Sequence, residues 1–267
     1  MELAISTACY FSKLFTEESF AEIKKLGITT CEVFLSTFCE YESSFAEMLK
    51  EKSRGLKVYS VHALTNQFEP ELFNISPRTR ADAEKLFDKV VSSGRALGAK
   101  YYTFHGPTRL KKKAYKFDFE KLGERFRQLN ERAMAQGVKM AYENVHWTFF
   151  SEPDYWVNLR RFCPGLNTVL DIKQAMQSRM DYADFLEVMK GSLANVHICD
   201  WDENGRLCMP GRGITDFKEL FKRLEDAGYD GPVTLEIYAD AYQDFWEIKD
   251  CLDYLLSLYP FTTDGRA

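Results

Sequence analysis

Several carboxylate and imidazole side chains stand at the ends of short apolar runs in this sequence. Such side chains are the ligands that divalent cations such as Mn²⁺, Co²⁺, Zn²⁺ and Mg²⁺ accept in proteins. Buried together, several charges would be costly unless they were paired with one another or bound to a metal. If the fold brings the run ends together, the pattern therefore predicts a divalent-metal site. The residues concerned are Glu32, His62, His105, Glu143, Asp171, His197 and Glu236.

Each of these residues also has an ordinary structural interpretation. A lone strand-end histidine is more often a core residue bonded to a backbone carbonyl, and a lone glutamate is usually a salt-bridge partner. The fact that every one of them ends an apolar run favours a shared site over separate structural roles. The metal hypothesis therefore depends on which fold positions the run ends.

The apolar runs have the length of β-strands and alternate with longer segments of helical periodicity. They are almost continuously apolar, which is typical of parallel strands buried on both faces. Apolar residues at helical spacing predict helices in the intervening segments, for example over 119–133 and 245–255. We expect strands at 3–6, 30–35, 58–62, 101–105, 138–145, 168–171, 195–199 and 233–238.

Parallel strands need crossover connections, and helical crossovers of this length give βαβ units. Eight such units predict an α/β fold, a (β/α)8 TIM barrel, as a single domain over residues 1–267. The alternative is a doubly wound open sheet, which the absence of a GxGxxG motif after the first run disfavours. In a barrel, the C-terminal ends of the strands form one mouth, where the polar side chains could converge.

Composition excludes some classes of protein and makes others less probable. The chain has 35 Lys plus Arg against 40 Asp plus Glu, a net charge of −5, which weighs against a nucleic-acid partner. No apolar run approaches the roughly 20 residues of a membrane span, and the N-terminus has no basic segment typical of a secretory signal, so we expect no membrane partner. The 7 cysteines form no CxxC pair, which indicates reduced thiols and a cytoplasmic protein.

Taken in order, short motifs along the whole chain resemble those of the xylose isomerase-like TIM-barrel superfamily. This superfamily holds sugar phosphate isomerases/epimerases and the class II AP endonucleases. Each motif is weak alone, whereas their order and placement together are fairly specific. The motifs are VYSVHA (58–63), TFHGP (103–107), AYENV (141–145), VLDIKQA (169–175), VHICD (196–200), PGRG (210–213) and TLEIY (234–238).

The resemblance implies one divalent metal ion held by Glu143, Asp171, His197 and Glu236. It also implies a sugar or sugar-derivative isomerase or epimerase, in which the catalytic residues Glu143 and Glu236 move protons. Such a reaction needs a base on one face of the substrate and an acid on the other, while the metal stabilises the enediolate between them. The substrate class would be a small polyhydroxylated carbonyl compound.

The sixth-strand motif departs from the family pattern of Asp-x-x-His. Gln174 replaces the histidine and can still form hydrogen bonds to a substrate, but it does not titrate near neutral pH. Lys173 adds a positive charge that either binds an acidic substrate or points to solvent. The resemblance places Gly205 and Leu207 where the AP endonucleases hold part of a third zinc ion, so a phosphodiesterase is a less favoured alternative.

Further candidates for substrate binding lie near the expected mouth. His62 and His105 either contact substrate or belong to the core, and Arg206 either binds a substrate oxygen or is a solvated loop residue. Trp147 and Trp201 follow metal-ligand positions closely and could line a pocket. A metal-dependent polyol dehydratase or lyase and a non-catalytic sugar-binding barrel remain alternatives, and a homo-oligomer remains open.

Overall fold

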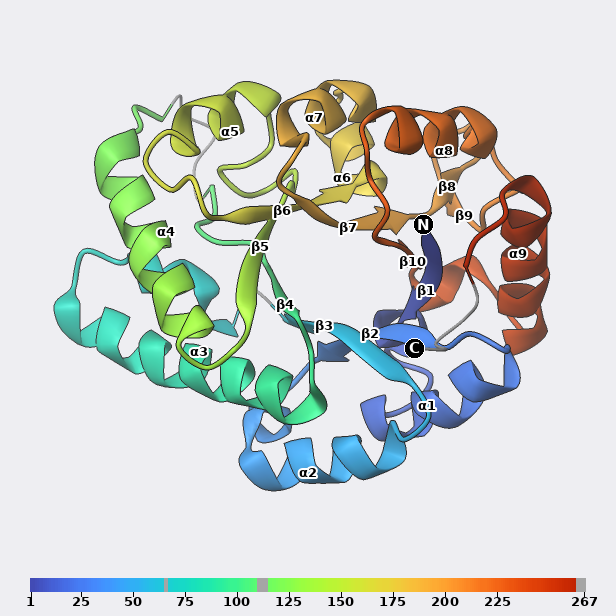
Figure 1. Cartoon of the computed structure of the whole chain (residues 1–267), viewed down its shortest axis with the longest axis horizontal. Coiled ribbons are helices and arrows are strands. Elements are labelled where there is room, and N and C mark those ends of the chain that lie inside the picture. Colours follow the sequence, from blue (N-terminus) through green and yellow to red (C-terminus); the bar gives the residue numbers. More distant parts are fainter. Residues whose placement is uncertain (65–66, 110–114, 263–267) are drawn as a thin grey trace.

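Eight parallel strands close into a barrel at the centre of the molecule, with helices around it (Figure 1). The computed structural model describes residues 1–64, 67–109 and 115–262. The strands follow one another around the barrel in chain order, and β1 pairs with β10 to close it. The predicted (β/α)8 barrel is thus confirmed. Its strands are β1 (Glu2–Ser6), β2 (Thr30–Leu35), β3 (Lys57–Ala63), β4 (Tyr101–Phe104), β5 (Lys139–Glu143), β6 (Asn167–Asp171), β7 (Leu193–Ile198) and β10 (Pro232–Leu235).

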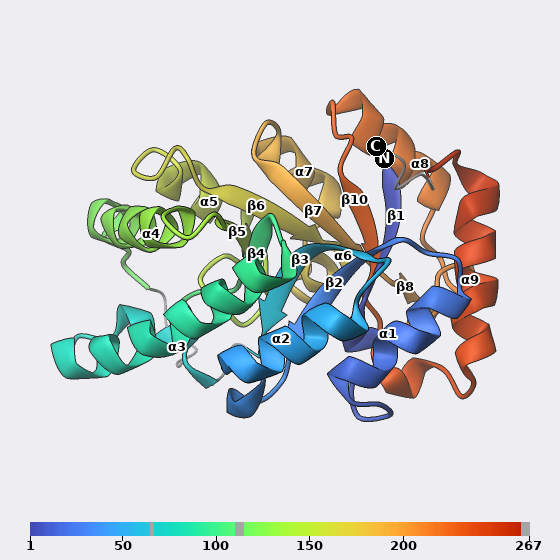
Figure 2. The same ribbon diagram turned by 60° about the horizontal axis from the view of Figure 1, so that its bottom comes forward.

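The helices connect the strands and pack on the outside of the barrel (Figures 1 and 2). Local signals set their ends: Ser76 and Asp118 accept hydrogen bonds from first-turn N–H groups, and Gly98 ends its helix at φ 75°. The helices are α1 (Thr16–Lys25), α2 (Ser43–Lys52), α3 (Pro77–Leu97), α4 (Phe119–Met134), α5 (Pro153–Leu159), α6 (Ile172–Gln177), α7 (Tyr182–Met189), α8 (Phe217–Asp226) and α9 (Phe245–Leu258).

Side chains along each strand point alternately outward and inward, so the layer between strands and helices is apolar and the barrel interior is polar. Tyr102 and Phe104 of β4 join the large core between strands and helices. Successive side chains of a strand point to opposite faces, so Thr103 and His105 point into the barrel. The interior therefore carries the residues that the sequence picks out at the strand ends.

Several details differ from the sequence-based expectation. β4 ends at Phe104, so His105 follows the strand, and Glu32 lies in the middle of β2 rather than at its end. β10 ends at Leu235, so Glu236 lies just beyond the strand rather than within it. After β7, a short antiparallel hairpin of β8 (Asp200–Trp201) and β9 (Leu207–Cys208) interrupts the βα rhythm. Within the described part of the chain, no helix is long and apolar enough to cross a membrane.

Candidate metal centre and active site

Four side chains from neighbouring strands converge at the mouth of the barrel. Glu143, Asp171 and His197 come from β5, β6 and β7, and Glu236 follows β10. Their ligand atoms all lie within 4.8 Å of one another, and all four residues are buried. The structure therefore brings together the four residues predicted to bind a metal.

Helix α6 and a neighbouring amide hold Asp171 in place. Asp171 is the N-cap of α6, and its Oδ1 accepts a hydrogen bond of 3.0 Å from Gln174 N–H. Asn144 Nδ2 donates to the Asp171 carbonyl at 2.9 Å, and Asn144 Oδ1 accepts from Asp171 N–H at 2.8 Å. The remaining oxygen, Oδ2, is fully buried and accepts no hydrogen bond from the described residues. An orphaned carboxylate oxygen of this kind fits a metal ligand.

Glu32 orients His197 from inside the barrel. Glu32 Oε1 lies 3.2 Å from His197 Nε2, and Glu32 Oε2 accepts hydrogen bonds from Ser60 (2.8 Å) and Thr103 (2.7 Å). The other ring nitrogen, Nδ1, lies 3.3 Å from Glu143 Oε1. If Glu32 accepts the Nε2 proton, Nδ1 presents its lone pair to the cluster, as metal-bound histidines do when a carboxylate holds their other nitrogen.

The buried carboxylates create a strong demand for positive charge. Burial raises the pKa of Asp171 to about 7; Lys173 opposes this rise, whereas Glu143 and Glu236 add to it. For Glu236, burial is outweighed by Lys173 and His197, which hold its pKa well below the usual range. A divalent cation would relieve the repulsion that Asp171 experiences. The donor set and the orphaned oxygen together fit a bound divalent ion.

Lys173 points into the site rather than to solvent. It lies in the first turn of α6 and is only 3% exposed. Its Nζ lies 2.9 Å from Glu236 Oε2 and 3.4 Å from Asp171 Oδ2. Of the two orientations that the sequence leaves open, the structure shows the inward one.

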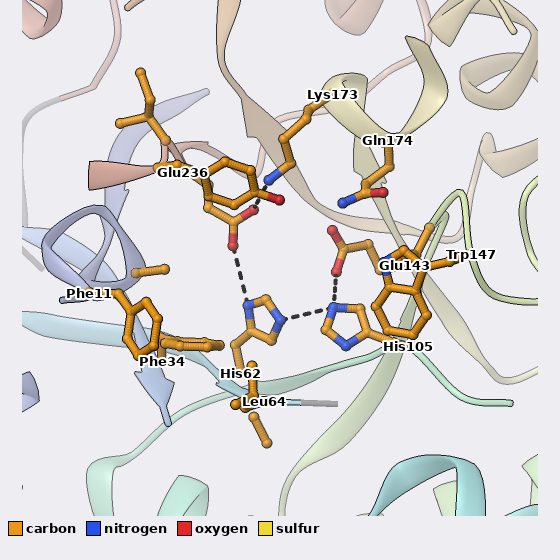
Figure 3. A pocket seen from close by; sticks show the side chains of 15 residues that line it. Phe11, Phe34, His62, Leu64, His105, Glu143, Trp147, Lys173, Gln174 and Glu236 are labelled. Carbon is orange, nitrogen blue, oxygen red and sulfur yellow. Dashed lines mark hydrogen bonds and ion pairs between the residues drawn. The ribbon is translucent and has the colours of Figure 1, made fainter. Parts of the chain in front are cut away.

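His62 and His105 form a bridge between the two glutamates (Figure 3). Their Nε2 atoms are 2.9 Å apart; His105 Nε2 lies 2.8 Å from Glu143 Oε2, and His62 Nδ1 lies 3.4 Å from Glu236 Oε1. Burial alone would lower the pKa of His62, but Glu236 and Glu32 raise it to about 10. His62 and His105 also form, with Glu143, a second group of side chains able to hold a metal.

A cavity of about 480 Å³ opens above the cluster (Figure 3). Trp147 lies beside His105, with ring centroids 6.0 Å apart, and Phe34 lies beside His62 at 5.1 Å. Gln174 also faces the cavity, although its Oε1 is engaged by His146 N–H (3.2 Å) and Nδ1 (2.6 Å). The cavity is thus mostly apolar and aromatic, with a small polar floor.

Two residues predicted to bind substrate lie outside the lining of this cavity. Arg206 is exposed and pairs with Asp202 at 2.9 Å, at the turn of the β8–β9 hairpin. Trp201 is buried within that hairpin. Nearness to strand seven along the sequence suggested both residues, whereas the hairpin carries the chain away from the cavity.

Asn144 and Glu69 support the site without having been predicted from the sequence, and Glu32, a predicted site residue, proves to be a partner of His197. Glu69 is fully buried in a 3-10 helix (Glu69–Phe73) and accepts hydrogen bonds from Tyr102 Oη (2.6 Å), His105 N–H (2.8 Å) and Gly106 N–H (3.0 Å). Glu32 could be found from the sequence because it lies in an apolar run. Asn144 and Glu69 hold backbone groups, and such contacts cannot be predicted from residue type and spacing.

The sequence is similar to a known protein family and to a curated enzyme. A family model described as a xylose isomerase-like TIM barrel matches residues 20–255. A 3-dehydroshikimate dehydratase of Pseudomonas aeruginosa is 27% identical over 150 residues, which are 51% of this chain and 24% of that protein. The matched region thus spans about a quarter of that curated relative.

Two solved structures share the fold over nearly their whole length. D-psicose 3-epimerase from Clostridium cellulolyticum, solved with D-tagatose, has a TM-score of 0.77 at 17% identity, covering 97% of this chain and 99% of its own. The IOLI protein with a binding zinc atom has a TM-score of 0.79 at 17% identity, covering 97% and 98%. With a family model that spans most of the sequence, the chain belongs to the xylose isomerase-like TIM barrel family.

Proposed function

We propose that the protein is a divalent-metal-dependent isomerase or epimerase of a small polyhydroxylated carbonyl compound. The observation that carries the proposal is the convergence of Glu143, Asp171, His197 and Glu236 beside an open cavity that Glu143 and Glu236 line. The similarity to a sugar epimerase and to a zinc-containing structure supports it. The metal could be Mn²⁺, Co²⁺, Zn²⁺ or Mg²⁺, since carboxylate and imidazole ligands suit all four.

Glu143 and Glu236 are the proposed proton-transfer residues. They lie at opposite ends of the His62–His105 bridge, so their carboxylates flank the floor of the cavity (Figure 3). One can remove a proton from a substrate carbon while the other returns a proton on the opposite face. A divalent ion bound by the four ligands would polarise the substrate oxygens and stabilise the developing enediolate.

The residues around the cavity would bind and orient the substrate. His62, His105 and Lys173 offer donors to its oxygens, and Gln174 can donate through its free amide NH₂. Trp147 supplies an apolar ring face, which suits the C–H face of a sugar. With all seven thiols free in the structure, the cytoplasm remains the proposed location.

A dehydratase is the second candidate. It is favoured by the similarity to 3-dehydroshikimate dehydratase, which covers half of this chain. The same base and metal can remove a proton and then expel a hydroxyl group from the neighbouring carbon as water. The two reactions therefore differ in the fate of the intermediate and not in the residues that form it.

The test is a solvent-deuterium experiment on Mn²⁺-loaded protein with a panel of ketoses and hydroxy-carbonyl acids. An isomerase or epimerase incorporates deuterium at the carbon next to the carbonyl, whereas a dehydratase gives a product that has lost water. Glu143→Gln and Glu236→Gln should each lower turnover by at least about 100-fold, the lower range for a removed acid–base group. Glu17→Gln, in the neighbouring cavity, is the matched control and should leave turnover unchanged.

Normal turnover by either glutamine variant would contradict the assigned roles. Failure of the whole panel to react, in protein that retains its metal, would favour a non-catalytic sugar-binding barrel.

A further inference from the structure

Lys173 places a positive charge where a divalent ion would bind. Its Nζ contacts Glu236 Oε2 at 2.9 Å and Asp171 Oδ2 at 3.4 Å, and both residues belong to the four-ligand set. Asp171 Oδ2 is the orphaned oxygen that otherwise accepts no hydrogen bond from the described residues. The ammonium and a metal ion would therefore need the same oxygens.

The start of helix α6 places Lys173 beside these ligands. α6 begins directly after Asp171, so the second residue of the helix stands beside the ligand that caps it. The Lys173 ammonium lies 4.6 Å from the ring centroid of Tyr238, which covers it on one side. Glu236, Asp171 and the Tyr238 ring are the partners that the structure gives to Nζ.

The charges in the cluster change when a metal ion binds. Glu143, Asp171 and Glu236 supply three carboxylates, which a divalent ion alone does not neutralise. Without a metal, Lys173 offsets part of this negative charge. With a metal, the ammonium is a like charge within a few ångströms of the ion, in a buried site where such repulsion is strong.

We propose that the Lys173 ammonium is a tethered competitor of the divalent metal, which must displace it from Asp171 Oδ2 and Glu236 Oε2 in order to bind. Lys173 thereby lowers the metal affinity of the site. The inference rests on the metal centre of the proposed function. Because Lys173 also lines the cavity, the displaced ammonium has open space on the side where substrate would bind.

Isothermal titration of metal-free protein with Mn²⁺ tests this inference directly. Lys173→Met removes the charge and keeps most of the side-chain volume, and should bind Mn²⁺ on the order of 100-fold more tightly than the wild type. The matched control is Lys13→Met: Lys13 donates to the Tyr242 carbonyl at 2.7 Å, outside the cluster, and its loss should leave the Mn²⁺ affinity unchanged.

Thermal unfolding provides a second readout, in which loss of the Lys173 charge lowers stability without metal but increases the stabilisation that metal gives. Without metal, Lys173→Met should melt at a lower temperature than the wild type, because the carboxylates lose their counter-charge. With saturating Mn²⁺, the variant should gain more in melting temperature than the wild type gains. A purely structural lysine would give the first effect without the second.

A measurement on the wild type covers the case in which Lys173→Met does not fold. Mass spectrometry of amine-labelled protein should show faster labelling of Lys173 after Mn²⁺ is added, with Lys13 as the unchanged internal reference. Equal or weaker Mn²⁺ binding by Lys173→Met, or unchanged labelling of Lys173, would overturn the inference and leave the metal centre standing. Absence of Mn²⁺ binding by both proteins would overturn the metal centre itself.

Discussion

Glu69 provides a stability prediction whose size follows from its contacts. One of its oxygens accepts from Tyr102 Oη at 2.6 Å, and the other accepts from the backbone N–H groups of His105 and Gly106. The carboxylate therefore fixes the turn that carries His105 into the site. Glu69→Ala would leave three buried donors without partners, and each costs about 1–3 kcal/mol. Allowing for partial relaxation, we expect the free energy of unfolding to fall by about 3–5 kcal/mol.

Two milder variants separate this effect from a loss of packing. Glu69→Gln keeps a carbonyl oxygen for both backbone N–H groups, and its NH₂ can donate to Tyr102 Oη, so it should cost about 1 kcal/mol. Tyr102→Phe removes one donor together with its need for a partner, and should also cost about 1 kcal/mol. Urea unfolding followed by circular dichroism, in the presence of a chelator, measures all three variants. A Glu69→Ala cost no larger than that of Glu69→Gln would show that the carboxylate does not hold these three donors.

Two further predictions concern the elements that frame the site. Backbone N–H donation from Asp244 and the contacts with Arg212 lower the pKa of Glu247 to about 2, below its usual 4.5. The ionised Glu247 therefore stabilises the fold above pH 4.5, and this stabilisation is lost as the pH falls towards 2. In urea unfolding, Glu247→Gln should lower the free energy of unfolding by about 1 kcal/mol at pH 7 and by less at pH 3. Separately, Gly213→Ala would drive a Cβ into the Trp201 carbonyl oxygen, and should cost about 1–3 kcal/mol in the same assay.

Each of these predictions has its own control. A Glu247→Gln effect that is the same at pH 7 and pH 3 would show that the pKa of Glu247 is not lowered in the fold. For the glycine, Gly165→Ala is the matched variant because no atom lies within 4 Å of its added Cβ. Equal stability of the two alanine variants would contradict the close approach at Gly213.

The strand pattern predicted the barrel and a metal site at its mouth, whereas the family resemblance implied which four residues would hold the ion. Parallel strands buried on both faces leave a continuous apolar signal, and a polar residue at the end of such a run must have a partner. Glu143, Asp171 and His197 stand out because their strands make this contrast sharp. The structure places Glu236 beside the other three residues even though β10 ends one position earlier.

Other features depend on tertiary contacts that residue spacing does not encode. Glu69 acts from a 3-10 helix far along the chain from the backbone that it holds. Arg206 lies close to strand seven in sequence, but a two-strand hairpin turns it towards Asp202. The inward direction of Lys173 depends on α6 starting directly after Asp171, which cannot be read from strand alternation.

The central claim is that four strand-end side chains share one divalent ion. The most direct test is a crystal structure of Mn²⁺-soaked protein with anomalous diffraction at the manganese absorption edge. We expect a single strong peak bonded to Glu143, Asp171, His197 and Glu236, with Lys173 Nζ moved away from both carboxylates. An ion bound instead by His62, His105 and Glu143, or no peak at the barrel mouth, would contradict it.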